Sequence, residues 1–208
     1  MTDINSVLDQ LASEGASPPS SGKLRFAGPL LAVLALCAVG AALILDGAFA
    51  SMARDGMGPI AVKWGFSLIL LGLSAVALFV LGKPGRPTRA VMIGVALPFV
   101  VILTLFGVEI ATTGPMVYGE TWRQCLMAMS VMSPIAFVGA IYAARSLAPT
   151  NLRRAGLVAG LFGGAVAMMA YAPFCPERGV GYMVVFYLLP ILAMAAIGWA
   201  LGPRLLRW

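Results

Sequence analysis

Two cysteines in the second half of the sequence, Cys125 and Cys175, have the side chains best suited to chemistry. A thiolate reacts with oxidants and binds soft metal ions such as copper or cadmium, and thioethers favour the same ions. Residues of the kinds that support such a site lie near both positions: Glu120, Trp122, Arg123, Met127, Met129, Pro176 and Glu177. Arg123 is expected to favour the thiolate of Cys125, because a neighbouring cation stabilises the charged form. The pattern favours a redox-sensing or metal-sensing cysteine pair that requires no resident cofactor.

The spacing of the chain places both cysteines at the same height. Cys125 lies 19 residues before the end of one apolar segment, and Cys175 lies 20 residues after the start of the next. These spacings correspond to roughly 29 and 30 Å of helix. A short link joins the two segments, so they are expected to form an antiparallel hairpin. Three interpretations remain open: a structural disulfide, a reversible sensor, and two unpaired packing cysteines.

The sequence argues against an enzyme. It contains no histidine, which removes the usual residue of many hydrolases, proton relays and metal sites. Cys37 lies near the middle of an apolar segment and is expected to be a packing residue. A thiol-disulfide exchange enzyme usually carries a C-x-x-C motif or a second cysteine pair, and neither is present. A membrane thiol-disulfide or metal-handling protein without a protein partner remains the alternative.

The composition indicates that these cysteines belong to a membrane protein. Of the 208 residues, 61% are hydrophobic and 11% are charged, whereas a soluble domain has about 25% charged residues. Six apolar segments are long enough to cross a hydrocarbon core of about 30 Å, namely 27–45, 59–81, 90–110, 122–144, 155–171 and 180–201. Helices satisfy their own backbone groups in lipid. The predicted fold class is therefore all-α, a polytopic membrane protein with six transmembrane helices.

The basic residues predict the orientation of these helices. On the side of the N-terminus lie Lys23, Arg25, Lys83, Arg86, Arg89, Arg145, Arg153, Arg154, Arg204 and Arg207, which are ten of the 14 Lys and Arg residues. The positive-inside rule then predicts cytoplasmic N- and C-termini. Because the charges form short clusters beside apolar helices, we interpret the net charge of +6 as a topology signal, with no direct nucleic-acid binding. The expected division is a cytoplasmic segment and tether (1–26), a transmembrane sensor domain (27–202) and a cytoplasmic tail (203–208).

The first residues of the chain predict a short amphipathic helix. Ile4, Val7, Leu8 and Leu11 recur at helical spacing, and a Gly/Ser/Pro-rich tether follows at 15–22. A helix of about three turns is marginal alone in water, so something must cover its apolar face. The segment either lies on the membrane or frays, or it docks in the groove of a soluble cytoplasmic partner. Its three acidic residues argue against an anionic membrane surface.

Small and charged residues add two expectations for the membrane domain. Gly156, Gly160 and Gly164 recur every fourth residue and predict close approach of a second helix. Asp46, Lys63 and Glu109 lie near the outer ends of their segments, where side chains can reach water. Because the predicted helices carry no charge at mid-membrane, a small-solute carrier or channel is disfavoured.

Several stretches of the sequence together resemble one protein family. They are the leucine-containing N-terminal segment, 122–126 (WRQCL), 148–150 (APT) followed by Ala155 and Gly156, 171–177 (YAPFCPE) and 201–208 (LGPRLLRW). With these residues the chain resembles the NrsF-like membrane anti-sigma factors of bacteria. The resemblance covers nearly the whole chain.

The resemblance implies a function as well as a fold. Members are six-helix proteins of the bacterial inner membrane that hold an extracytoplasmic-function sigma factor inactive and release it under heavy-metal or oxidative stress. Carried onto this chain, the two periplasmic cysteines are Cys125 and Cys175, and the N-terminal segment contacts the sigma factor. A histidine often precedes the second cysteine in the family, where this sequence has Phe174. The difference favours thiol oxidation over metal coordination.

Overall fold

A computed structural model describes residues 4, 6, 9, 19–49, 52, 56–83, 85–114, 119–147 and 149–207. These residues are predominantly helical and include no strand. The long helices are α2 (Pro19–Ile44), α4 (Gly58–Leu81), α5 (Arg89–Thr113), α6 (Trp122–Arg145) and α7 (Leu152–Tyr171). The short 3₁₀ helix η1 (Ala172–Phe174) follows α7. The last transmembrane helix consists of three consecutive parts: α8 (Val180–Met183), the π-helix η2 (Val184–Leu188) and α9 (Leu189–Leu205).

The prediction of six transmembrane helices is confirmed. Within the described part of the chain, six helical stretches are long and apolar enough to cross a membrane, and they match the six predicted segments in order. The first helix begins at Pro19, inside the segment expected to be a tether, and not at residue 27. Proline is tolerated in the first turn of a helix, because the N–H that it lacks would have no helical partner there.

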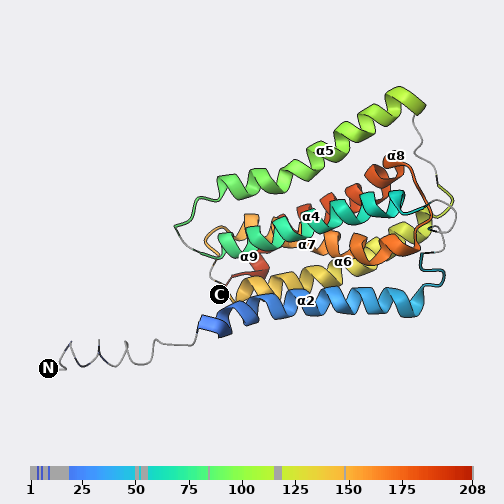
Figure 1. Cartoon of the computed structure of the whole chain (residues 1–208). Coiled ribbons are helices and arrows are strands. Elements are labelled where there is room, and N and C mark those ends of the chain that lie inside the picture. Colours follow the sequence, from blue (N-terminus) through green and yellow to red (C-terminus); the bar gives the residue numbers. More distant parts are fainter. Residues whose placement is uncertain are drawn as a thin grey trace.

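Successive long helices run in opposite directions, so their termini gather at two ends of the bundle (Figure 1). The starts of α2, α5 and α7 and the ends of α4, α6 and α9 form one end, which we call the basic end. It carries Arg25, Lys83, Arg86, Arg89, Arg145, Arg153, Arg154, Arg204 and Arg207. We call the opposite end, which holds Cys125 and Cys175, the cysteine end. Which side of the membrane each end faces stays a prediction.

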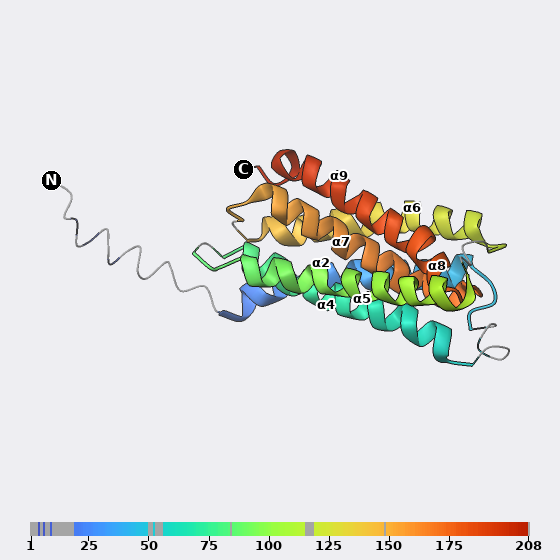
Figure 2. The ribbon, with the colours of Figure 1, turned by 90° about the horizontal axis from the view of Figure 1, so that it is seen from above.

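Helix α7 is the centre of the bundle. It packs against α2, α4, α6 and α9, and almost all of its residues are buried. Seen from above, α7 runs between α9 and α5 (Figure 2). A Cβ added at Gly156 or at Gly160 would collide with backbone of α9, at Gly198 and Met194 respectively. The predicted glycine contact is therefore confirmed, and α9 is the helix that approaches.

Candidate functional site

The structure brings Cys125 and Cys175 together at the cysteine end. Cys125 lies in the first turn of α6, and Cys175 lies in extended backbone directly after η1. Both side chains are buried, and neither thiol forms a disulfide bond. The two thiols are close enough to interact electrostatically. The expectation that they share one height of a helix hairpin is confirmed, since α6 and α7 pack together. Cys175 lies just beyond the helix, on the connection to α8.

Pro190 leaves a backbone carbonyl available to accept a hydrogen bond from the Cys125 thiol. Pro190 has no N–H to donate to the carbonyl of Phe186, four residues earlier, and the helix forms the π-helical turn η2 just before it. The Cys125 thiol donates a hydrogen bond to the Phe186 carbonyl, with 3.5 Å between Sγ and O. A change at this sulfur therefore acts directly on the irregular turn that begins the last transmembrane helix.

The tyrosine Tyr187 lies between the two thiols. It is fully buried, and its hydroxyl approaches both Cys125 and Cys175. The hydroxyl nevertheless makes no hydrogen bond with any described residue. The ring packs against Tyr171 and Tyr182, with centroids 6.2 and 6.4 Å away. The cysteines thus share a buried aromatic pocket, in which the Tyr187 hydroxyl has no hydrogen-bond partner among the described residues.

Lys63 of α4 anchors the segment that carries Cys175. Its Nζ donates hydrogen bonds to the carbonyl oxygens of Cys175 (3.1 Å) and Glu177 (2.7 Å), and the side chain is only 3% exposed. The expectation that Lys63 reaches water is therefore wrong, because the two carbonyls take the place of water as acceptors. Lys63 also interacts electrostatically with Cys125 and lies 5.8 Å from the centroid of the Tyr187 ring.

A second contact from α4 secures the same segment one turn earlier. Pro173 has no N–H for the carbonyl of Met169, which lies four residues before it. The indole N–H of Trp64 donates to that carbonyl instead, at 3.3 Å. The carbonyl of Pro173 in turn accepts a hydrogen bond from the backbone N–H of Phe49.

Glu177 joins the segment to the start of α6. Its Oε1 accepts hydrogen bonds from the backbone N–H and the hydroxyl of Thr121, at 3.3 and 3.1 Å. Gly119 allows this approach, since a Cβ there would collide with the Glu177 carboxylate and the Tyr182 ring. The carboxylate thereby holds the chain immediately before the helix of Cys125.

Glu109 connects α5 to the same end. Its two carboxylate oxygens accept hydrogen bonds from the backbone N–H groups of Val180 (3.0 Å) and Gly181 (2.6 Å), the first residues of α8. The first N–H groups of a helix have no internal partner, and a negative charge there is favourable. Glu109 thus caps a helix while its side chain stays half-exposed, which agrees with the expectation that it reaches water.

Of the other residues predicted to support the cysteine pair, one is buried and the rest are exposed or half-buried. Trp122 and Arg123 are exposed and stack on each other, with the guanidinium carbon 5.2 Å from the ring centroid. Lys63, and not Arg123, is the cation that interacts with Cys125. Met129 is buried one helical turn after Cys125, whereas Met127 is 68% exposed. Glu120 is exposed and Pro176 is half-buried.

The predicted docking residues lie almost wholly outside the described residues. Ile4 is described and is helical and exposed, which agrees with the predicted helix at this position. Val7, Leu8 and Leu11 are not among the described residues. Their role as a docking face stays a prediction.

The site offers two buried sulfurs for a ligand. In the part of the chain that the structure describes, His, Cys, Asp and Glu side chains form no group of three that would hold a metal ion. Two thiolates suit a soft ion such as Cu(I) far better than they suit magnesium or calcium. The arrangement therefore fits thiol oxidation, or capture of a soft ion by the two sulfurs.

The fold and the site together define a polytopic helical membrane protein with a buried cysteine pair at one end. A family model described as NrsF, negative regulator of sigma F, matches residues 11–208. The chain belongs to this family of anti-sigma factors, whose role is regulatory and not enzymatic. Both the resemblance noted in the sequence and the prediction that the protein is not an enzyme are thereby confirmed.

Two curated relatives agree with the family model. The "Probable anti-sigma-F factor NrsF" of Azospira oryzae is 36% identical over 152 residues, which cover 71% of each chain. The "Anti-sigma-F factor NrsF" of Caulobacter vibrioides is 31% identical over 147 residues, which cover 67% of this chain and 68% of the relative. No solved structure matches the chain.

Proposed function

We propose that this chain holds an extracytoplasmic-function sigma factor inactive at the bacterial inner membrane and releases it when Cys125 and Cys175 are modified. Membership of the anti-sigma family supports the sigma factor as partner. The observation that carries the sensing part is the burial of both cysteines at a junction of several elements. The Cys125 thiol donates to a carbonyl of η2, and the backbone carbonyl of Cys175 accepts from Lys63 of α4. Glu177, two residues after Cys175, accepts from Thr121 just before α6. A sensor needs such connections, because a modification must favour one arrangement of the helices over another.

Oxidation is the first form of the signal. The two thiols lose two protons and two electrons and form one S–S bond, while a two-electron oxidant such as a peroxide is reduced to water. The Cys125 thiol then no longer donates to the Phe186 carbonyl. Cys175 is tied to α4 through Lys63, so drawing the sulfurs together pulls on α4, α6 and η2 at once.

Capture of a soft metal ion is the second form. Both thiols would lose their protons to the solvent and bind copper or cadmium as thiolates. The buried ammonium of Lys63 supports either form, since it stabilises negative charge on the sulfur of Cys125. Phe174 precedes Cys175 where the family often has histidine, which makes oxidation the favoured signal.

Helix α2 is the shortest route from the site to the partner. It follows the N-terminal segment directly and packs against α6, which carries Cys125. The thiol of Cys37 on α2 lies 3.9 Å from the carbonyl oxygen of Met132 on α6, and Gly139 of α6 lets Val33 of α2 approach closely. We propose that a shift of α6 moves α2 and thereby the docking face of Ile4, Val7, Leu8 and Leu11.

The sensing part is tested with the double variant Cys125→Ser and Cys175→Ser. Under an oxidant or cadmium, a reporter gene read by the sigma factor should stay repressed in the variant and be induced in the wild type. Cys37→Ser is the matched control and should respond normally, since it lies apart from the cysteine pair and a serine hydroxyl can still donate to the Met132 carbonyl. Full induction in the double variant would refute the cysteine switch.

The docking part is tested by co-purification from detergent-solubilised membranes. Mass spectrometry should find a sigma factor with the intact chain and lose it when residues 1–18 are deleted, a change that leaves the start of α2 in place. Replacement of Leu8 and Leu11 by Asp should free the partner in the same way. Retention of the sigma factor by both variants would refute docking through this segment.

A further inference from the structure

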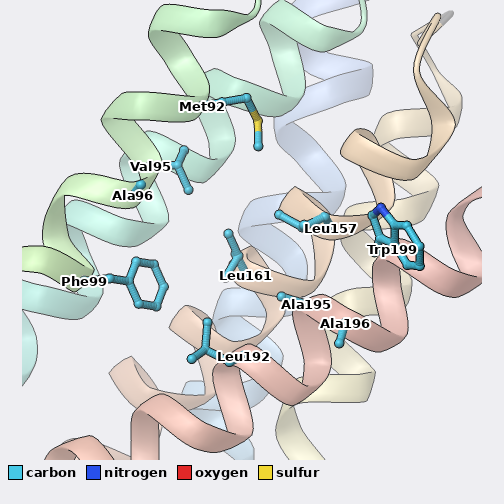
Figure 3. Close-up of a pocket in the computed structure, with 10 residues that line it drawn as sticks. All are labelled: Met92, Val95, Ala96, Phe99, Leu157, Leu161, Leu192, Ala195, Ala196 and Trp199. Atoms are coloured by element: carbon cyan, nitrogen blue, oxygen red, sulfur yellow. The ribbon is translucent and has the colours of Figure 1, made fainter.

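A groove lined by apolar side chains runs between α5, α7 and α9, on the half of the bundle nearer the basic end. It has a volume of about 540 Å³ and is lined by Met92, Val95, Ala96, Phe99, Leu157, Leu161, Leu192, Ala195, Ala196 and Trp199. Figure 3 shows α5 as one wall, α9 as the other, and Leu157 and Leu161 of α7 between them. The volume lies in the range of about 300–1,000 Å³ that is usual for ligand sites.

The groove continues into a second cavity at the basic end. This cavity of about 490 Å³ shares Met92 and Ala96 with the groove, and its other lining residues include Arg89 and Arg154. The guanidinium groups of Arg89 and Arg154 therefore lie at the basic end of the apolar groove. The side chains of both are exposed.

The surroundings of these cations suit an anion. Arg154 donates a hydrogen bond from Nη1 to the hydroxyl of Thr88, at 3.0 Å, which holds it beside the start of α5. Thr88 makes no side-chain cap there, and the first turn of α5 has no acidic residue. From residue 19 onward the Asp and Glu residues are Asp46, Asp55, Glu109, Glu120 and Glu177, and none of them belongs to a helix terminus or link at the basic end. Uncapped helix N–H groups and two guanidinium groups both bind phosphate well.

The length of the groove matches one leaflet of a bilayer. Arg89 and Phe99 are ten residues apart on α5, which corresponds to about 15 Å of helix. The hydrocarbon core of a bilayer is about 30 Å thick, so the groove extends from the headgroup level to about the midplane. Trp199 lies at the same end as Arg153, whose guanidinium carbon is 4.7 Å from its ring centroid, and tryptophan is common at the headgroup level.

We propose that this groove binds one anionic phospholipid, with its phosphate between Arg89 and Arg154 and an acyl chain between α5 and α9. The lipid completes the packing of α5, whose main helix contacts among the described residues are with α4 and, at the cysteine end, with α8 and η2. This site is distinct from the cysteine pair, and the proposal stands independently of sigma-factor binding.

The proposal is tested by native mass spectrometry of the full chain in detergent. Phosphatidylglycerol and phosphatidylcholine with the same acyl chains are titrated, and the fraction of protein carrying one lipid is measured. The expected result is at least about tenfold tighter binding of phosphatidylglycerol, because only its headgroup carries net negative charge towards the two arginines. Equal binding of the two lipids would overturn the proposal.

Two pairs of variants locate the site. Replacement of both Arg89 and Arg154 by Gln should remove the preference, whereas Lys83→Gln with Arg86→Gln removes the same charge from the same end and should keep it. An equal loss in both double variants would indicate a general surface charge effect and overturn the proposal. An Arg89→Gln/Arg154→Gln protein that keeps the lipid preference but loses the sigma factor would assign the arginines to the protein partner, which also overturns it.

A second pair tests the apolar part of the groove and does not depend on the arginines. Ala96→Phe with Ala196→Phe fills the groove and should reduce binding of phosphatidylglycerol at least about tenfold, as expected when bulk replaces a ligand in a packed site. Ala32→Phe with Ala35→Phe adds the same bulk to the exposed face of α2 and should leave binding unchanged. Unchanged binding in the groove-filled variant would overturn the proposal.

Discussion

Replacing Lys63 with Met should open the segment that carries Cys175. The change keeps most of the side-chain volume but removes the ammonium that donates to the carbonyls of Cys175 and Glu177, at 3.1 and 2.7 Å. A hydrogen bond to a charged group contributes about 1.5–3 kcal/mol. Part of this gain offsets the cost of burying the ammonium, so we expect the pair to stabilise the closed segment by about 3 kcal/mol in total.

The loss of this free energy should be measurable as a faster rate of chemical labelling at Cys175. Since about 1.4 kcal/mol corresponds to a factor of ten, the open fraction of the segment should rise by about 100-fold. The assay is the labelling rate of Cys175 by a membrane-impermeant maleimide, in protein whose other two cysteines are serine. When opening is fast relative to labelling, this rate follows the open population.

Lys83→Met is the matched control for this prediction. Lys83 follows the other end of the same helix, is exposed, and places its Nζ 4.2 Å from the centroid of the Phe79 ring. Its replacement should leave the labelling rate of Cys175 unchanged. A Lys63→Met rate within about threefold of the wild type, equivalent to less than about 0.7 kcal/mol, would refute the anchoring role of Lys63.

Three further predictions concern the same framework. Gly160→Leu should lower the free energy of unfolding in detergent by several kcal/mol, because the side chain collides with backbone of α9, whereas Gly65→Leu has open space and should have little effect. Glu109→Gln should destabilise the start of α8 by about 1–2 kcal/mol in denaturant titrations, and Glu120→Gln, which is exposed, should not. Trp64→Phe should speed amide exchange of the turn after α7 about tenfold, the result of losing one hydrogen bond of about 1.4 kcal/mol.

The six helices and the meeting of the cysteines follow from simple properties of the sequence. Apolar length alone predicts the spans, because lipid permits few other structures. The rise per residue then places Cys125 and Cys175 at one end without knowledge of the packing. The glycines of α7 predict a close helix contact, but the sequence does not name α9 as the partner, since several helices are candidates.

The polar contacts of the site were harder to predict. From the sequence, Lys63 and Glu109 are charged residues at the ends of apolar segments, where water is the expected partner. Their actual partners lie on the connection between α7 and α8, more than 70 residues away, and so could not be identified from the sequence. Two prolines carried a signal that sequence reasoning missed. A proline inside or after a helix leaves the carbonyl four residues earlier without its donor, and both Pro173 and Pro190 have such a carbonyl bound by another helix.

The central claim is that the state of one cysteine pair decides whether the sigma factor stays bound. It is tested most directly by reconstituting the full chain with its sigma factor in lipid nanodiscs and measuring the retained fraction before and after a mild two-electron oxidant. The account predicts that the wild type releases the sigma factor and binds it again after reduction, while the Cys125→Ser/Cys175→Ser protein retains it throughout. Release from the double variant, or retention by a wild type whose two cysteines are oxidised, would contradict the account.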